Sequence, residues 1–208
     1  MTPAAMLARG LVELGIALPA GAEQKMHAYL ELLLKWNQTY NLTAIREPLK
    51  MVSHHLLDSL SVARHIAPGS IADIGAGAGL PGIPLAIAQP ERAISLNDAN
   101  HKKAAFLRQA SIELGLKNLT VVHGRAEKWQ PERQFDCVIS RAFADLADFL
   151  SAGSHLALPD GQFAAMKGVY PDDELTRLPA GFRCGKVVPL RVPFVEGTRH
   201  LVLCRREA

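Results

Sequence analysis

The chain has 208 residues, of which 49% are hydrophobic and 21% charged, and its formal net charge is +3. This length suits one α/β domain with a small extension and is too short for two full domains. No run approaches the roughly 18 consecutive apolar residues of a membrane-spanning helix. We therefore expect a soluble, cytoplasmic protein without a membrane partner.

Positive charge is concentrated near the C-terminus. Residues 175–208 contain seven Lys or Arg and two Glu, a net charge of +5, whereas residues 1–174 sum to −2. Such a segment can bind a phosphate backbone, although an ordinary solvated face explains the same charges as well.

Three cysteines, Cys137, Cys184 and Cys204, share no CxxC spacing. Their odd number and spacing argue against a disulfide framework and a zinc site. We therefore expect three buried thiols and no metal.

Helical periodicity dominates the first part of the chain. Apolar residues recur at helical spacing over residues 23–40, and Trp36 is expected to pack in the core. A further helix is predicted over residues 50–65. The domain prediction is therefore a helical extension, residues 1–66, packed on a core domain formed by residues 67–208.

The core domain alternates short apolar runs with helical stretches, which is typical of βαβ units in a parallel sheet. The predicted strands are 70–74, 93–97, 119–122, 135–140 and 162–166, and the predicted helices are 84–88, 102–114 and 144–156. The end of the chain, 187–205, predicts an antiparallel hairpin instead. Dinucleotide dehydrogenases usually end in another parallel unit, so the hairpin favours an α/β fold of the Rossmann-like class I methyltransferase type.

A glycine-rich loop, IADIGAGAGLPGIPLAI at residues 71–87, joins the first predicted strand to a helix. Glycines permit a tight turn and the close approach of a ligand. Gly77, Gly79 and Gly82 match GxGxxG, a weak indication of NAD binding. However, the first glycine after the strand is Gly75, and Asp73 precedes it by two residues.

The position of Asp73 favours a cationic ligand over NAD. A carboxylate would repel a pyrophosphate, whereas it suits the ammonium and sulfonium groups of S-adenosylmethionine, directly or through water. Pro81 and Pro84 also remove backbone donors that a phosphate would use. The loop therefore predicts an S-adenosylmethionine site.

The next two predicted strands end in further candidate cofactor contacts. Asp98 can accept hydrogen bonds from ribose hydroxyls, which NAD and S-adenosylmethionine share. Ala126 and Glu127 should lie beside the adenine, although Glu127 by position alone would also suit an exposed loop.

A possible metal-binding group occurs at His54, His55 and Asp58. Neighbouring histidines point to different sides of a helix, so only one of them can share a ligand sphere with Asp58. We expect helix-surface and capping roles for these three residues.

Several segments together resemble a known family. They are LLKWNQTYNLTAI (33–45), HHLLDSL (54–60), DIGAGAGLPGIPLAI (73–87), KKAAFLRQ (102–109), GRAE (124–127), ISRAFA (139–144), MKG (166–168) and GTRHLVL (197–203). In these segments the chain is similar to the bacterial 16S ribosomal RNA guanine-N7 methyltransferases, also called glucose-inhibited division protein B or RsmG. The similarity covers nearly the whole chain.

The resemblance implies S-adenosylmethionine as cofactor and 16S ribosomal RNA or the 30S subunit as partner. We expect the protein to act as a monomer. The cofactor contacts that it implies are Gly75, Leu80, Ala126, Glu127 and Arg141, beside which the loop and strand patterns predict Asp73, Gly77 and Asp98. The candidates for an RNA-facing rim are Arg125, Arg141, Lys167, Arg199 and His200.

The segment after the fourth predicted strand, SRAFAD, contains neither the NPPY motif of amine methyltransferases nor the Pro-Cys motif of cytosine C5 methyltransferases. Guanine N7 has an in-plane lone pair and no proton, so positioning can suffice without a general base. We expect Arg141 to orient guanine through O6 or to bind a phosphate, and a structural salt bridge is the alternative.

Three other functions stay open at this point. They are an NAD-dependent oxidoreductase, a non-catalytic RNA-binding module with the same fold, and a small-molecule methyltransferase. The last hundred residues contain no recognisable hydride-transfer group, and the basic C-terminal segment makes a small-molecule substrate less attractive.

Overall fold

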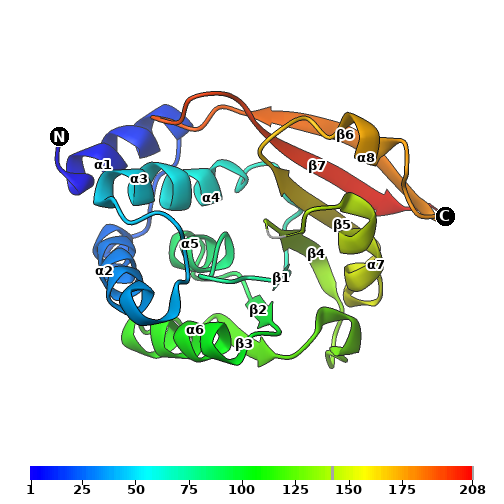
Figure 1. The fold of residues 1–208 in the computed structure, drawn as a ribbon, viewed down its shortest axis with the longest axis horizontal. Coiled ribbons are helices and arrows are strands. Elements are labelled where there is room, and N and C mark those ends of the chain that lie inside the picture. Colours follow the sequence, from blue (N-terminus) through cyan, green and yellow to red (C-terminus); the bar gives the residue numbers. More distant parts are fainter. Residues whose placement is uncertain (142, 208) are drawn as a thin grey trace.

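In a computed structural model, which describes residues 1–141 and 143–207, one mixed sheet crosses the molecule in the strand order β3-β2-β1-β4-β5-β7-β6 (Figure 1). Its strands are β1 (Ile71–Ile74), β2 (Ile94–Asp98), β3 (Leu119–His123), β4 (Phe135–Ser140), β5 (Ala157–Lys167), β6 (Phe182–Leu190) and β7 (Arg199–Arg206). Strands β1 to β5 pair in parallel, and β7 runs antiparallel between β5 and β6. The predicted mostly parallel sheet with its C-terminal antiparallel hairpin is confirmed.

The central strands are buried on both faces. All four residues of β1 and five of the six residues of β4 are buried, which explains why these strands read as nearly continuous apolar runs. Asp73 is the polar exception in β1 and has no exposed surface. A buried carboxylate in a central strand requires partners, and the loop that follows provides one of them.

Helices cover both faces of the sheet (Figure 1). Helices α5 (Gly82–Ala88) and α6 (His101–Glu113) share a buried cluster on one face, and α7 (Leu146–Gly153) packs on the other face with η3 (Ser154–Leu156). Asn100 caps α6 by accepting from the backbone N–H groups of Lys102 and Lys103, so this helix begins one residue before its predicted start. Within the described residues, every helix is too short or too polar to cross a membrane.

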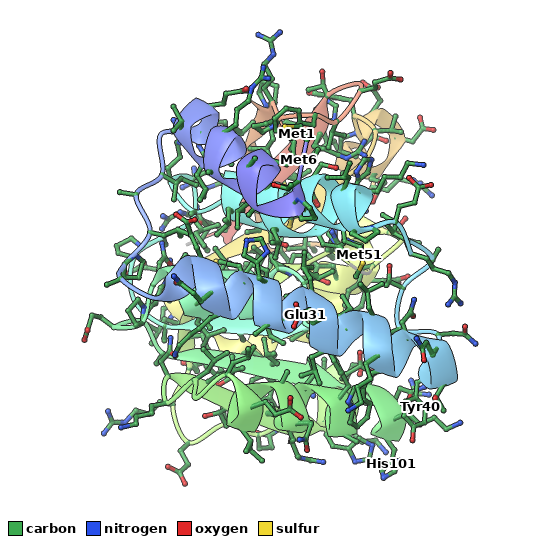
Figure 2. The ribbon with its side chains drawn as sticks, turned by 90° about the vertical axis from the view of Figure 1, so that its left-hand side faces the viewer. Met1, Met6, Glu31, Tyr40, Met51 and His101 are labelled. Atoms are coloured by element: carbon green, nitrogen blue, oxygen red, sulfur yellow. A yellow bond between two sulfur atoms is a disulfide. The ribbon has the colours of Figure 1, made fainter. Side chains whose placement is uncertain are left out.

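The N-terminal part is helical, as predicted, and packs beside α5 and α6 (Figure 2). Its elements are α1 (Pro3–Leu14), α2 (Ala22–Tyr40), α3 (Pro48–Met51), the π-helical turn η1 (Val52–Leu57) and α4 (Asp58–Ser61). The prediction of one regular helix over residues 50–65 is wrong in detail, since a π-helical turn interrupts the α-helix and the last α-helical residue is Ser61. The pattern of apolar residues does not distinguish the i+4 hydrogen bonds of an α-helix from the i+5 hydrogen bonds of a π-helix. The boundary between residues 66 and 67 stays a prediction.

The expectation of three buried thiols is wrong for two of the cysteines. A disulfide joins Cys184 of β6 to Cys204 of β7, which lie opposite each other in the antiparallel register. Partners on neighbouring strands meet whatever their separation in sequence, here 20 residues, so the spacing gave no indication of the pair. Cys137 is a free cysteine and is fully buried in β4. Ala142, within the SRAFAD segment, and Ala208 lie outside the described residues.

Candidate active site

The glycine loop follows β1 at the carboxyl edge of the parallel strands. Gly75, Gly77 and Gly79 have φ angles of 68°, 59° and 88°, a region that residues with a Cβ rarely adopt. The turn lets the chain reverse within seven residues and enter α5 at Gly82. The loop therefore presents backbone rather than side chains at the sheet edge, where parallel α/β proteins bind their ligands.

Asp73 lies beneath this loop. Its Oδ2 accepts a hydrogen bond of 2.8 Å from the backbone N–H of Gly82, whereas its Oδ1 is buried without a hydrogen-bond partner among the described residues. A Cβ at Gly82 would lie 2.1 Å from the Leu96 side chain and 2.8 Å from Asp73, so only glycine fits there. Burial raises the pKa of Asp73 to about 7, against the smaller opposing effects of the Gly82 N–H and the Arg141 guanidinium.

A cavity of about 170 Å³, which we call the glycine-loop cavity, opens beside the loop. It is lined by Leu42, Thr43, Gly75, Ala76, Gly77, Ala78, Leu80, Lys103 and Arg141. The fold thus brings together four predicted cofactor residues: Gly75, Gly77, Leu80 and Arg141. It adds residues to which the sequence analysis assigned no role, namely Leu42 and Thr43 from the loop after α2, and Lys103 from α6.

The other predicted cofactor residues lie near the same edge but do not line this cavity. Asp98 ends β2, where its Oδ2 accepts from the Gly77 N–H and its Oδ1 from the Asn100 N–H, at 2.8 and 2.7 Å. Ala126 is buried at the start of the short helix η2 (Ala126–Lys128), and Glu127 is exposed beside it. For Asp73, Asp98, Ala126 and Glu127, contact with a cofactor stays a prediction.

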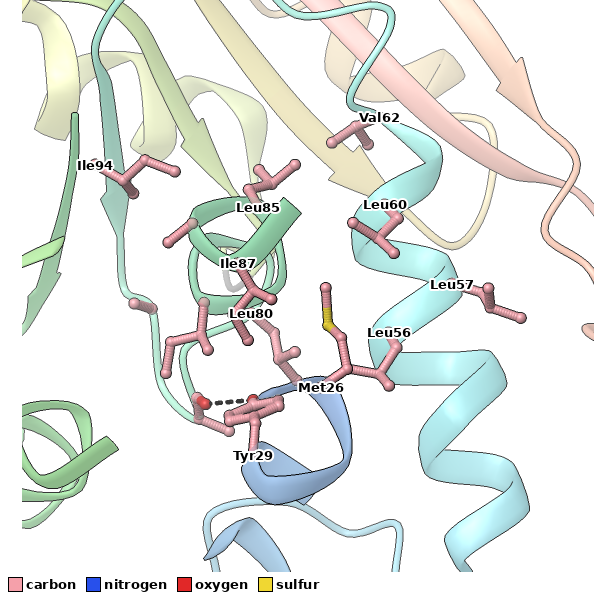
Figure 3. Packing of buried hydrophobic residues seen from close by; sticks show 14 of the residues in the cluster. Met26, Tyr29, Leu56, Leu57, Leu60, Val62, Leu80, Leu85, Ile87 and Ile94 are labelled. Atoms are coloured by element: carbon pink, nitrogen blue, oxygen red, sulfur yellow. Dashed lines mark hydrogen bonds between the residues drawn. The ribbon is translucent and has the colours of Figure 1, made fainter. Parts of the chain in front are cut away.

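A tyrosine from the N-terminal helices supports the glycine loop. The hydroxyl of Tyr29 in α2 donates a 2.7 Å hydrogen bond to the carbonyl oxygen of Ala78, as Figure 3 shows. Tyr29 is fully buried, and this burial raises the pKa of its hydroxyl, so the group stays a donor at neutral pH. The helical extension therefore fixes the position of the loop that lines the cavity.

Arg141 follows the end of β4 and connects the loop to a second cavity. Its Nη1 donates to the carbonyl oxygen of His54 at 2.9 Å and to Asp58 Oδ2 at 3.0 Å. The Arg141 side chain is 28% exposed, and it lines both cavities. Arg141 thus forms a structural salt bridge, as the alternative prediction had it. The same side chain also lines both cavities and can contact a ligand there.

The second cavity, which we call the basic cavity, has a volume of about 290 Å³. It is lined by Ile45, His54, His55, Asp58, Arg141, Met166, Lys167, Gly168, Leu190, Arg199 and His200. Three predicted RNA-facing residues, Lys167, Arg199 and His200, are therefore brought together with Arg141. Arg125 is exposed in the loop before η2 and does not line this cavity.

Lys167 is held within the chain. Its ammonium group donates to Glu174 Oε2 at 2.7 Å and to the carbonyl oxygens of Phe143 and Ala144 at 3.3 and 3.0 Å. These bonds join the end of β5 to the loop after β4 and to α8 (Asp172–Leu175). A contact between Lys167 and RNA stays a prediction, since all three ammonium donors have partners here.

His55 lies between the two cavities. Its Nε2 is 2.9 Å from Thr43 Oγ1, and Thr43 lines the glycine-loop cavity, whereas His55 lines the basic cavity. Burial, and then the charge of Arg141, lowers the pKa of His55 to about 4. The imidazole is therefore neutral at neutral pH. Burial also raises the pKa of the Cys137 thiol to about 12, so this side chain supplies no thiolate.

The expectation of helix-surface and capping roles is wrong for Asp58 and His55. Both are buried, and Asp58 pairs with Arg141, 83 residues further along the chain. No signal in the sequence indicates that partner, because it depends on how α4 packs against the end of β4. The only sequence observation that points to this region is that HHLLDSL (54–60) is one of the segments that resemble the family.

Comparison with known proteins gives the family. A family model described as rRNA small subunit methyltransferase G matches residues 22–202. The chain is 51% identical over 199 residues to the Ribosomal RNA small subunit methyltransferase G of Chromobacterium violaceum, with 95% of each chain covered. It is 51% identical over 208 residues to that of Aromatoleum aromaticum, with 98% of this chain and 99% of the relative covered. The chain belongs to the rRNA small subunit methyltransferase G family.

Solved structures agree with this membership at the level of the fold. The glycopeptide N-methyltransferase MtfA complexed with S-adenosylmethionine is 14% identical, with a TM-score of 0.63 over 74% of this chain and 88% of that one. A SAM dependent methyltransferase from Aquifex aeolicus is 20% identical, with a TM-score of 0.57 over 76% of this chain and 93% of that one. In this rRNA small subunit methyltransferase G family member, the glycine loop thus occurs in a fold shared with methyltransferases.

Proposed function

We propose that the chain transfers a methyl group from S-adenosylmethionine to N7 of a guanosine in the 16S ribosomal RNA of the small ribosomal subunit. The observation that carries this proposal is the position of Arg141, which lines both the glycine-loop cavity and the basic cavity. A methyl donor in the first and an RNA base in the second would meet beside this side chain. Membership of the family supplies the substrate class.

The residues of the glycine loop fit the cofactor. Gly75 and Gly77 expose backbone in a conformation that only glycine adopts readily, and Leu80 adds an apolar wall. Asp73 Oδ1 has no hydrogen-bond partner among the residues that the structure describes, so it can accept a hydrogen bond from a water or from a cationic group of the cofactor. Asp98, Ala126 and Glu127 follow along the same sheet edge for the ribose and the adenine. When bound, S-adenosylmethionine supplies a methyl group on a positively charged sulfur.

The chain's own residues orient the target and do not abstract a proton from it. Guanine N7 carries a lone pair and no proton, so alignment supplies most of the acceleration. Arg141 can donate to guanine O6 or to a phosphate, while Arg125, Lys167, Arg199 and His200 form the proposed RNA-facing rim. His55, which lies between the two cavities, has its pKa lowered to about 4 and is unsuited to base catalysis at neutral pH.

The test is methyl transfer followed by mapping of the modified base. The protein is incubated with methyl-labelled cofactor and with either naked 16S RNA or 30S subunits from cells that lack the enzyme. We expect label at N7 of one guanosine. Titration calorimetry with S-adenosylmethionine and NADH runs in parallel. Preferential NADH binding would favour an oxidoreductase, and cofactor binding without transfer to either RNA would favour a non-catalytic RNA-binding module.

We also propose that the enzyme acts in the cytoplasm, as a monomer and without a membrane partner. Residues of a single chain line both cavities, so no second copy is needed to complete the site. Analytical ultracentrifugation of the protein with and without cofactor should give one species of about 22.5 kDa. A stable dimer would contradict this part of the proposal.

A further inference from the structure

A buried carboxylate connects two arginines at the basic cavity. Asp58, the first residue of α4, is 5% exposed. Its Oδ2 lies 3.0 Å from Arg141 Nη1, and its Oδ1 lies 3.9 Å from Arg199 Nε. The arginines belong to different elements, since Arg141 follows β4 and Arg199 begins β7. One carboxylate from the N-terminal helices therefore hydrogen-bonds one of these cations and forms a longer ion pair, without a hydrogen bond, with the other.

The two guanidinium groups keep access to the cavity. The Arg141 and Arg199 side chains are 28% and 30% exposed, and both line the basic cavity. Lys167 also lines it, but its ammonium group is held by Glu174 and two backbone carbonyls. Two arginines paired with one carboxylate leave a net positive charge, which suits the carbonyl and phosphate oxygens of a nucleotide.

The backbone around Asp58 is unusual. The six preceding residues form the π-helical turn η1, and π-helical turns occur frequently at functional sites. His54 of this turn offers its carbonyl oxygen to Arg141 at 2.9 Å, beside the Asp58 carboxylate. Arg141 thus has two acceptors from a single turn of the N-terminal helices, one on the backbone and one on a side chain.

We propose that the basic cavity receives the target guanosine and that Asp58 is a positioning residue, which holds Arg141 and Arg199 in the arrangement that binds it. This inference rests on the proposed function and deepens it. Without the carboxylate, the two like charges would repel each other and their side chains would sample more rotamers. The target base would still reach the cavity, but it would be aligned less often with the methyl donor.

The central variant is Asp58→Asn, which keeps the size of the side chain and removes its charge. Its matched control is Glu47→Gln, which removes an exposed carboxylate that pairs with Lys50 at 3.1 Å in the same N-terminal part of the chain. The readouts are cofactor affinity by calorimetry, thermal unfolding, and the single-turnover rate with 30S subunits over a range of concentrations.

For Asp58→Asn we expect a rate at saturating RNA about 30-fold below wild type, because misalignment by about 1 Å can slow a reaction by up to 100-fold. Cofactor affinity should fall much less than the rate, since Asp58 does not itself line the glycine-loop cavity and Arg141 keeps its hydrogen bond to the His54 carbonyl oxygen. A purely structural defect would lower cofactor affinity and rate together. Glu47→Gln should match the wild type throughout. In an Arg199→Gln background the effect of Asp58→Asn should shrink, because one of the two arginines that it positions is gone.

The outcomes separate this inference from the proposed function. If the wild type transfers no methyl group to RNA, the proposed function falls and this inference falls with it. If the wild type is active and Asp58→Asn is equally fast, or loses cofactor affinity in parallel with rate, only the inference is overturned. If Asp58→Asn does not fold, Arg199→Gln decides: a slower rate at saturating RNA with unchanged cofactor affinity supports the inference, and an unchanged rate overturns it.

Discussion

Two glycines with similar φ angles make it possible to distinguish two effects of a substitution, namely backbone strain and the loss of a ligand site. Gly75 has a φ of 68° and lines the glycine-loop cavity, whereas Gly115 has a φ of 59° and a Cβ there would meet nothing within 4 Å. Valine in this region costs about 1–3 kcal/mol at either position. We expect Gly75→Val to weaken S-adenosylmethionine binding at least 100-fold, about 2.7 kcal/mol, and Gly115→Val to leave it unchanged.

Calorimetry on both variants measures this difference, and thermal unfolding checks that both remain folded. Equal cofactor affinity in the two variants would place the cofactor away from the glycine loop.

At the same scale, the pKa values of Asp73 and His55 predict how cofactor affinity and the rate of methyl transfer depend on pH. Burial raises the pKa of Asp73 to about 7, so the carboxylate gains its negative charge as the pH rises through 7. Affinity for the cationic cofactor should therefore increase between pH 6 and 8, and Asp73→Asn should abolish that increase. With cofactor and RNA both saturating, the rate should be flat from pH 6.5 to 8.5, because a bound cation keeps Asp73 ionised and His55 titrates near 4.

Single-turnover rates across this range provide the measurement. A step near neutral pH that disappears when one side chain is replaced would show that a base takes part, and guanine N7 would then be a doubtful target.

At the scale of elements, α2 is coupled to the glycine loop through one hydroxyl group. Replacing Tyr29 by Phe leaves the buried carbonyl oxygen of Ala78 without its donor, at a cost of about 1–3 kcal/mol in the free energy of unfolding. Because Ala78 lines the glycine-loop cavity, we also expect cofactor affinity to fall several-fold. Tyr40→Phe, in the same helix but 39% exposed, should change neither quantity.

Chemical denaturation and calorimetry on both tyrosine variants test the coupling. If Tyr29→Phe lowers stability and leaves cofactor affinity intact, the N-terminal helices support only the core and take no part in the site.

At the scale of the whole molecule, the fold places two arginines of the basic C-terminal segment near opposite ends of one strand. Arg199 starts β7 at the basic cavity, and Arg205 lies six residues further on, about 20 Å away in an extended strand. Arg205 donates to the carbonyl oxygen of Asp160 instead. We expect Arg199→Glu to weaken RNA binding and to reduce the slope of log affinity against log salt by about one, and Arg205→Glu to have little effect.

Filter binding of 16S RNA between 50 and 200 mM salt, values chosen to span the range where phosphate contacts weaken, measures both slopes. RNA affinity that does not depend on salt would remove the electrostatic argument for the basic cavity.

The local elements and the tight turn of the glycine loop could be predicted from the sequence alone. Strand β4 occupies the predicted residues 135–140, and Gly75, Gly77, Leu80 and Arg141, which the loop pattern and the family resemblance named, line one cavity. Such predictions succeed because apolar periodicity and glycine conformation depend on residues a few positions apart. The carboxyl ends of parallel strands then meet at one edge, so residues that follow different strands become neighbours.

Which distant residues meet becomes visible only in the folded chain. Asp58 reaches Arg141 and Arg199, Tyr29 reaches Ala78, and Cys184 faces Cys204, although nothing local in the sequence indicates any of these pairs. Each pair depends on how a helix docks on the sheet, or on the register between two strands. The packing of the whole core sets both the position of each helix on the sheet and the register of the strands. The partner of a buried side chain therefore cannot be identified from nearby residues in the sequence.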